Sequence, residues 1–457
     1  MIEWLSKYRK PWFWVVLHVF LGLVSTISAI PLIIYFYVFL FSSLLSISSK
    51  KRSMTNLSLI IVYLIPFEII ARMAQTSPFM PYELSKYLMF FLLVYGIFRG
   101  ANGGRIGYFL LFLLIPALFY DMSNEVDYQG LVFNVLAPIN LCLGVIYFYK
   151  NPITPEQFKK LITFLVLPLI SALAFTYIKT PDFDTIEFTL SANFDTTGGF
   201  GSNQVSTVFG LGMFLIFYLW YNRIYLSGYS LVDAGILFLF SFQGLLSFSR
   251  GGMVGGVFAI LIFLFFNSKK KGSANYRSKS AKRFLIPGLI LVFVSIWLAN
   301  EVTDGQLLLR YQGETAGTLS GSKEKDLNTI TSSRTSIFEG DFELFQEHSM
   351  GVGAGASRYL RKELNGVVSH TELSRLIAEH GFLGALFFIV LSLIPFNFYN
   401  KNYPREWKGF MIALFFLAWY TSFHAATRNF VTPLLIGIAL MHIQPEKSRT
   451  INKQVAT

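Results

Sequence analysis

Two arginines and one histidine are the residues of this chain whose type and setting could perform chemistry. Arg250 stands in Ser-Phe-Ser-Arg-Gly-Gly, Arg334 in Thr-Ser-Ser-Arg, and His370 in Ser-His-Thr-Glu. A guanidinium group binds phosphate oxygens through two parallel hydrogen bonds. A neutral imidazole can accept a proton from a hydroxyl group near neutral pH. Together, these residue types predict a site that binds an anion and deprotonates a hydroxyl group.

Arg250 lies where one apolar run of the sequence ends and the next begins. The glycines that follow form two overlapping G-x-x-x-G pairs, 251/255 and 252/256. Small residues at this spacing let two membrane helices approach closely. An arginine at the end of an apolar run can also simply extend its charge to the membrane surface. Because that role needs no tight glycine turn, we expect Arg250 to bind an anion.

Arg334 is predicted to lie in the first turn of a helix that Ser332 or Ser333 can cap. Apolar residues then recur at near-helical spacing, namely Ile337, Phe338, Phe342 and Phe345. This pattern predicts an amphipathic helix on the membrane surface. A cation is disfavoured at the positive end of a helix dipole. An anionic ligand bound at the same helix start would explain Arg334.

His370 lies in a segment that reads as a capping box, with Ser369 as N-cap and Glu372 at the third helical position. His370 would then be the first residue of a helix, where the positive end of the dipole favours its neutral form. The alternative is a polar residue at a membrane interface. His348, His380 and His424 are interpreted mainly as structural.

Two further patterns are weaker. Gly351-Val-Gly-Ala-Gly355 permits a tight turn and close backbone approach to a ligand, so Gly353 and Gly355 are candidate substrate-binding residues, with Arg358 and Arg361 just after them. Asp182-Phe-Asp184 has a spacing that can hold a divalent metal. We interpret it as a pair of solvated acids. Because the chain also has no zinc motif and no P-loop, it predicts no metal site and no cofactor.

Composition defines the fold that must position these residues. Of 457 residues, 53% are hydrophobic and 14% are charged, whereas soluble domains carry about 25% charged residues. Apolar runs of about 20 residues predict an all-α polytopic integral membrane protein with about 12–14 transmembrane helices. The expected parts are transmembrane helices with short loops (1–300, including an outer segment at 179–202), a large helical outer loop with the motifs (301–373), C-terminal transmembrane helices (374–443) and a tail (444–457).

The distribution of charge predicts the orientation. Most basic residues fall in alternate loops, and the acids are concentrated in the loops between them. Basic loops stay on the cytoplasmic side of a membrane. Both termini are therefore predicted to be cytoplasmic, and 301–373 to lie on the opposite face. The net charge of +12 is explained by these loops, so no nucleic-acid partner is expected.

The motifs resemble those of a known family. From Thr331 to Gly384 the chain has Ser-Ser-Arg, then GVGAG, then SHTELSRLIAEHGFLG, and SFSRGG and GGFGSNQVS precede them. This set resembles the O-antigen ligase and O-antigen polymerase superfamily of bacterial envelope proteins. The chain has Thr371 after the histidine where asparagine is commoner, and Ser333 where glycine is common.

The resemblance implies a metal-independent, inverting glycosyltransferase of the multi-spanning (GT-C-like) kind that uses lipid-linked sugars. Arg250 and Arg334 would hold undecaprenyl diphosphate, and His370 would deprotonate the acceptor hydroxyl. Asn203 and Arg428 are further candidate substrate-binding residues. The partners would be an undecaprenyl-diphosphate-linked glycan donor, lipid A-core or a glycan as acceptor, and membrane lipid. The protein would lie in the bacterial inner membrane with a periplasmic active site.

Four activities remain open at this stage. The leading one is an O-antigen ligase that moves a glycan onto lipid A-core, and the alternative is a polymerase that joins lipid-linked repeat units. Some superfamily members glycosylate proteins. A lipid-linked oligosaccharide flippase is less favoured, because transport predicts charged residues at mid-membrane depth. The pair Glu68/Arg72 and Asp233 are interpreted as packing or interfacial charges.

Overall fold

The computed structural model describes residues 10–48, 53–268, 276–331, 333–399, 403, 405–425 and 431–444. These residues are almost entirely helical. Their strands form one short parallel pair, β1 (Pro152–Ile153) and β2 (His442–Ile443). The predicted all-α fold is therefore confirmed.

Eight helices in the described part are long and apolar enough to cross a membrane. They are α3 (Ile30–Ser48), α4 (Ser53–Met73), α7 (Tyr128–Phe148), α8 (Pro155–Lys179), α9 (Ser202–Tyr221), α11 (Arg250–Ser268), α12 (Tyr276–Val302) and α18 (Glu372–Phe398). The other long helices are α2 (Pro11–Ser25), α5 (Leu84–Phe98), α6 (Arg105–Leu114), α10 (Ser230–Leu246), α19 (Arg405–Thr421) and the shorter α20 (Val431–Ala439). The chain is thus a polytopic helical membrane protein, while the number of spans stays a prediction.

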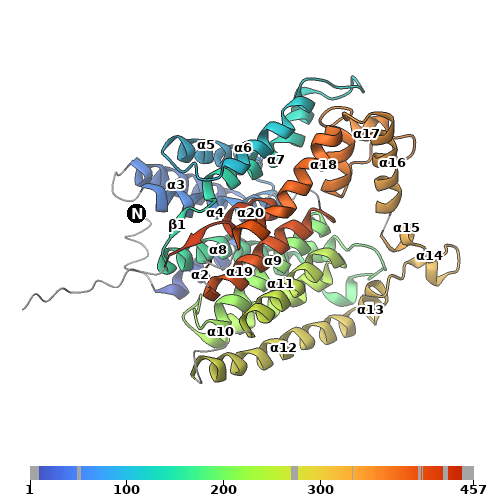
Figure 1. The fold of residues 1–457 in the computed structure, drawn as a ribbon. Coiled ribbons are helices and arrows are strands. Elements are labelled where there is room, and N and C mark those ends of the chain that lie inside the picture. Colours follow the sequence, from blue (N-terminus) through green and yellow to red (C-terminus); the bar gives the residue numbers. More distant parts are fainter. Residues whose placement is uncertain are drawn as a thin grey trace, which may run out of the picture.

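Helix α9 lies in the interior of the helical bundle, with α10 and α11 packed against it (Figure 1). Its residues 205–220 are all buried. Helix α11 approaches through its glycines: a Cβ on Gly252 would lie 2.2 Å from the backbone carbon of Ser206, and one on Gly256 would lie 2.6 Å from the carbonyl oxygen of Gly210. The close helix packing predicted at these glycines is confirmed.

The long hydrophilic segment between α12 and α18 folds into short helices at one end of the bundle, which we call the loop end (residues 303–371; Figure 1). These helices are α13 (Gln306–Tyr311), α14 (Ala316–Leu319), α15 (Leu327–Ile330), α16 (Arg334–Glu347) and α17 (Ser357–Leu360). Helix α16 packs against α18. The expectation that this segment carries its own structure is confirmed.

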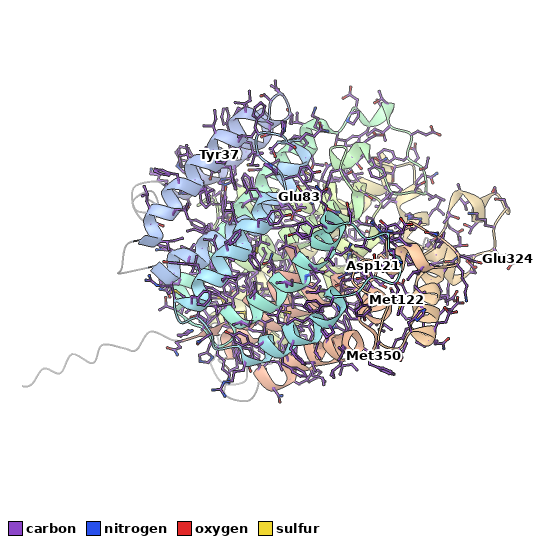
Figure 2. The ribbon with its side chains drawn as sticks, turned by 90° about the horizontal axis from the view of Figure 1, so that it is seen from above. Tyr37, Glu83, Asp121, Met122, Glu324 and Met350 are labelled. Carbon is purple, nitrogen blue, oxygen red and sulfur yellow. The ribbon has the colours of Figure 1, made fainter. Side chains whose placement is uncertain are left out.

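The glycine-rich turn, here residues 350–355, packs against the loop that follows α6 and its short 3₁₀ continuation η1 (Pro116–Leu118). The backbone N–H of Met122 and the hydroxyl of Tyr120 both donate to carbonyl oxygens of this turn, at 3.0 and 2.7 Å. Figure 2 shows Met122 and Met350 in the same part of the molecule. Gly353 has φ +101°, and a Cβ there would lie 2.2 Å from the carbonyl oxygen of Tyr120. Glycine is therefore required here by backbone packing.

Charged side chains within the apolar helices are paired locally. The carboxylate of Glu68 accepts a hydrogen bond from Nε of Arg72 at 2.7 Å and lies 3.1 Å from Nζ of Lys86. The Asp233 carboxylate accepts from the backbone N–H of Ser227 at 2.9 Å. These contacts join neighbouring segments, which agrees with their interpretation as packing charges.

Candidate functional site

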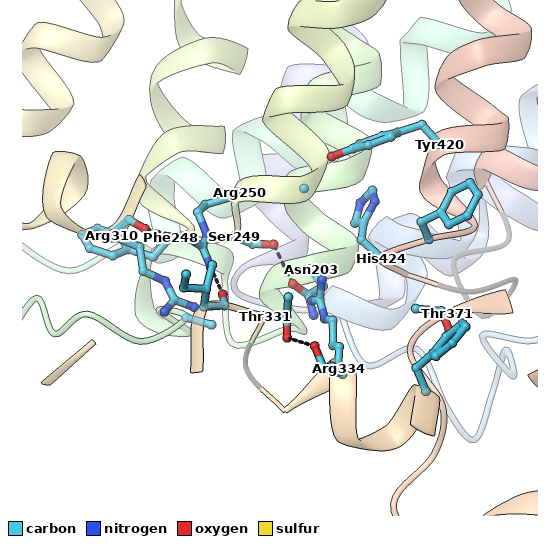
Figure 3. A pocket seen from close by; sticks show the side chains of 16 residues that line it. Asn203, Phe248, Ser249, Arg250, Arg310, Thr331, Arg334, Thr371, Tyr420 and His424 are labelled. Carbon is cyan, nitrogen blue, oxygen red and sulfur yellow. Dashed lines mark hydrogen bonds between the residues drawn. The ribbon is translucent and has the colours of Figure 1, made fainter. Parts of the chain in front are cut away.

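A cavity of about 480 Å³ lies where the loop end meets the helical bundle (Figure 3). Its walls come from the start of α9, the turn between α10 and α11, the short helices of the loop end and the end of α19. The lining residues are Ala192, Asn203, Phe248, Ser249, Arg250, Gly251, Arg310, Ile330, Thr331, Arg334, Thr335, Phe338, Thr371, Tyr420, Phe423 and His424. The cavity therefore joins segments that are more than 200 residues apart in the sequence.

Three arginines share this cavity: Arg250, Arg310 and Arg334 (Figure 3). Among the lining residues, all of which the structure describes, there is no aspartate or glutamate. Burial and the nearby charges of Arg250 and Arg334 lower the pKa of Arg310 to about 10. Burial, followed by the charge of Arg250, also lowers the pKa of Arg334. The three cations thus repel one another, and the cavity favours a bound anion.

Arg250 is the first residue of α11, as the sequence predicted. The preceding turn is tight, since Phe248 has φ +54°. The carbonyl oxygen of Ser247 in this turn accepts from the N–H of Asn193, at 3.1 Å. The Arg250 side chain donates to the carbonyl oxygens of Arg310, at 3.0 Å, and of Ile330. Arg250 therefore contacts the two ends of the stretch 310–330 within the loop end.

Arg334 is the first residue of α16, which confirms its predicted place in a first helical turn. Ser333 is the N-cap residue, but its side chain makes no capping hydrogen bond and its φ is +63°. Of the predicted apolar stripe, Ile337 is buried, while Phe338 is 38% exposed and lines the cavity rim. The other predicted cap, Ser332, lies outside the described residues.

His370 adjoins the cavity without being one of its lining residues. It is half-buried, and the next residue, Thr371, lines the cavity. The predicted capping box is wrong: α18 begins at Glu372, with Thr371 as N-cap and no side-chain cap bond. The Ser369 hydroxyl donates instead to the Asp341 carboxylate, at 2.8 Å. The general-base role of His370 stays a prediction.

Asn203 lines the cavity, as expected for a substrate-binding candidate. Its Oδ1 accepts a hydrogen bond from the Ser249 hydroxyl at 2.6 Å. Behind it, the Thr207 hydroxyl donates to the Asn203 carbonyl oxygen at 2.7 Å and lies 3.1 Å from Nε2 of His424. Two N-terminal turns of α9 are thereby tied to the cavity wall that His424 and Tyr420 form.

The structure places several other predicted substrate-binding residues away from this cavity. Gly353 packs against the loop after α6, and a Cβ on Gly355 would lie 2.9 Å from the Asn134 side chain. The Arg358 guanidinium lies over the ring of Tyr359. Arg361 pairs with a buried carboxylate (below). Their substrate contacts stay predictions, and Arg428 lies outside the described residues.

Sequence reasoning missed Arg310 and assigned His424 a structural role. Arg310 ends an apolar stretch, Gln-Leu-Leu-Leu-Arg, that has no motif around it. One signal was available: Arg310 is one of few basic residues outside the predicted cytoplasmic loops. His424 reaches the cavity because α19 packs against α11; a Cβ on Gly251 would lie 2.5 Å from its ring. No pattern within the sequence reports that contact.

The Asp-x-Asp pattern is placed away from the arginines. Asp182 and Asp184 belong to a short turn at η2 (Phe183–Thr185), both side chains are exposed, and neither lines the cavity. In the part of the chain that the structure describes, no three metal-ligating side chains of His, Cys, Asp or Glu gather at one place.

The fold and the site define the class: a polytopic helical membrane protein with a cationic cavity between its helical bundle and its loop end. Residues 235–389 match the family model described as O-antigen ligase. The predicted resemblance to the O-antigen ligase superfamily is thereby confirmed, and the matched region holds Arg250, Arg310, Arg334 and His370. Comparison with curated proteins found no match to the chain. The family match supports a function of the O-antigen ligase or polymerase type.

Proposed function

We propose that this protein transfers a glycan from undecaprenyl diphosphate to lipid A-core on the periplasmic face of the bacterial inner membrane. The observation that carries this proposal is the cluster of Arg250, Arg310 and Arg334 in a cavity without acidic lining residues, beside His370. The distribution of basic loops supports cytoplasmic termini and a periplasmic loop end. The proposed reaction is metal-independent and inverting.

The three guanidinium groups would bind the diphosphate of the donor. Guanidinium forks match phosphate oxygens with charge-assisted hydrogen bonds. Burial, and then repulsion by the other two arginines, lowers the pKa of Arg310, and this repulsion is relieved when an anion lies between the three groups. The aromatic side chains of Phe248, Phe338 and Phe423 give the cavity apolar walls, and electrostatic attraction is stronger where water is excluded.

The reaction follows from this arrangement. The acceptor hydroxyl attacks the anomeric carbon from the face opposite the diphosphate, and the bond from that carbon to the phosphate oxygen breaks. The hydroxyl proton passes to His370, and the electron pair leaves with undecaprenyl diphosphate. The arginines stabilise the charge that develops on the leaving group. One displacement gives an inverted product.

The experiment is the surface glycan profile of a host that lacks the gene, complemented with wild type or His370→Ala. Core without polymer, together with accumulated long lipid-linked polymer, is expected in the deletion strain. Wild type restores the polymer on core, and His370→Ala does not. The matched control is His348→Ala, which removes a histidine of the same loop end that does not line the cavity and should behave as wild type.

The same profile separates the alternatives. Core that carries a single repeat unit would identify a polymerase and contradict transfer of finished glycan. An unchanged surface profile with a lost protein glycan would identify a protein-directed transferase. Full restoration by His370→Ala would contradict the general-base role.

A further inference from the structure

Asp341 is a fully buried residue of α16, at the point where this helix faces the start of α18. Its Oδ2 accepts hydrogen bonds from the hydroxyl groups of Ser369 and Ser374, at 2.8 and 2.7 Å. Ser369 directly precedes His370, and Ser374 lies in the first turn of α18. One carboxylate of α16 therefore holds the junction that contains His370.

Thr371 is linked to the same carboxylate through Ser374. The Oγ atoms of Thr371 and Ser374 lie 2.5 Å apart. Because Ser374 gives its single hydroxyl hydrogen to Asp341, Thr371 is the donor in this pair. Both chain neighbours of His370 are thus attached to Asp341, one directly and one through a single hydroxyl. We call Asp341, Ser369, Thr371 and Ser374 the Asp341 clamp.

Helix α16 connects the Asp341 clamp to the arginine cavity. Arg334 is the first residue of α16 and lines the cavity, and Asp341 follows seven residues later. Seven residues are about two helical turns, so the two side chains leave the same side of the helix about 10 Å apart along its axis. A helix does not stretch easily, and α16 therefore sets the distance between Arg334 and the junction that contains His370.

Arg361 supplies the countercharge of the clamp. Its Nε lies 3.6 Å from Oδ1 of Asp341, and both side chains are fully buried. Its Nη2 donates to the carbonyl oxygen of Val367, shortly before the junction. A buried carboxylate is held in place when a cation and hydrogen-bond donors surround it. The segment that leads into His370 is therefore held at two points: Arg361 binds Val367, and Asp341 binds Ser369.

The hydroxyl groups of Ser369 and Thr371 do not cap helix α18. Serine and threonine ordinarily stabilise a helix start by accepting a hydrogen bond from its N–H groups. Here Ser369 donates to Asp341 and Thr371 donates to Ser374 instead, and α18 begins without a side-chain cap. The local sequence is thus used to fix the junction rather than to stabilise the helix end.

We propose that Asp341 is a positioning residue for the reaction: through the Asp341 clamp it holds His370 at a fixed place beside the arginine cavity. This inference rests on the proposed function, because it assigns to Asp341 the placement of the group that accepts the proton. It adds a residue that touches neither donor nor acceptor.

The test uses the full-length protein in detergent, with lipid-linked glycan and lipid A-core extracted from the host. Asp341→Leu keeps the branched shape but removes both acceptor oxygens, and Asp341→Asn keeps one. We expect Asp341→Leu to lower kcat about 100-fold, the effect of misplacing a reacting group by about 1 Å. The KM for the donor stays within about twofold of wild type, because the arginine cavity is intact. The kcat of Asp341→Asn should lie between those of wild type and Asp341→Leu.

The matched control is Glu339→Leu, which removes an exposed acid from the same helix and should leave kcat and KM unchanged. If Asp341→Leu does not fold, the double variant Ser369→Ala/Ser374→Ala removes the same two hydrogen bonds with less change of volume. It should show the same loss of kcat at constant donor KM. Equal losses of kcat and donor affinity in these variants would indicate a purely structural clamp and would overturn the inference.

The two proposals fail in different ways. If His370→Ala keeps full activity, the general-base role fails, and the positioning role of Asp341 fails with it. If His370→Ala is inactive while Asp341→Leu and Ser369→Ala/Ser374→Ala turn over as wild type does, the positioning role alone fails.

Discussion

Nη1 of Arg250 donates a hydrogen bond to the backbone carbonyl oxygen of Arg310, 3.0 Å away. The bond joins the first residue of a membrane-spanning helix to a short helix of the loop end. It also brings two like charges into one cavity, where burial and then the charge of Arg250 lower the pKa of Arg310. The two guanidinium charges repel each other unless an anion lies between them. The first prediction therefore concerns anion binding.

Inorganic pyrophosphate should stabilise the wild-type protein against heat, because it binds the folded cavity and not the unfolded chain. At 100 times the Kd, a single site contributes about 2.7 kcal/mol. Arg310→Ala should remove most of this stabilisation, because it removes one of the three charges that would hold the anion. The measurement is Tm in detergent against pyrophosphate concentration. A large Tm loss without ligand would assign Arg310 a structural role.

Arg334→Lys should fail to bind the donor normally. A lysine ammonium is a point charge and cannot form two parallel hydrogen bonds with phosphate oxygens. We expect the donor KM to rise about tenfold, or about 1.4 kcal/mol. Arg105→Lys is the control, since Arg105 is exposed and does not line the cavity. A wild-type KM in Arg334→Lys would argue against a bidentate contact.

The affinity for pyrophosphate should decrease when the pH rises through about 10, because Arg310 then loses its charge in the folded protein. The folded pKa lies below the ordinary value of 12.5, so protonation of Arg310 costs stability below pH 10, and this cost is relieved between pH 10 and 12.5. The Kd of pyrophosphate should differ more between pH 8 and pH 10.5 in wild type than in Arg310→Ala. The same difference in both proteins would show that another group titrates.

Gly252→Ala should destabilise the protein by about 2–3 kcal/mol, the upper range for overpacking. The added Cβ would meet the backbone of α9 at 2.2 Å, which no side-chain movement can relieve. Gly235→Ala is the control: that glycine lies in α10 with open space around its Cβ position, and alanine favours a helix there. Thermal unfolding of the two variants gives the comparison, and equal Tm values would contradict close α9–α11 packing.

Activity should be unchanged when the protein is assayed in a metal chelator. In the proposed reaction the diphosphate charge is balanced by arginines, so no divalent ion is required. Asp182→Asn/Asp184→Asn should also retain full turnover. Activity that is lost in chelator and restored by Mg²⁺ would contradict the metal-independent mechanism and would return attention to these two acids.

The sequence allowed much of the architecture to be predicted. Apolar stretches of the sequence form helices that end at polar residues: α5 (Leu84–Phe98), for example, ends directly before Arg99. The G-x-x-x-G pairs indicated close helix packing because small side chains at that spacing let two helices approach, and the structure shows that the partner is α9. Arg250 and Arg334 were also placed correctly at helix starts, because the position of a helix start can be predicted from neighbouring residues in the sequence.

The composition of the cavity could not be predicted in full, because its walls are set by long-range packing. Arg310 lies in no motif, and its role appears only when α13 is placed beside α11. The prediction of a capping box at Ser369 was wrong for a related reason. A hydroxyl before a helix can bond either to the helix or to a carboxylate elsewhere, and Asp341 is 28 residues away in the sequence. Local patterns cannot report that competition.

The cavity walls have a consequence for engineering. Arg310, Arg334 and Thr371 come from the loop end, whereas Asn203, Arg250 and His424 come from the bundle. A chimaera that exchanged only residues 303–371 with a relative would separate Asp341 from Ser374 of α18, and its loop end would meet a foreign Arg250 at two backbone carbonyls. The natural unit of exchange is therefore four stretches: the start of α9, the turn before α11, the loop end with the first turn of α18, and the last turn of α19 with Phe423 and His424.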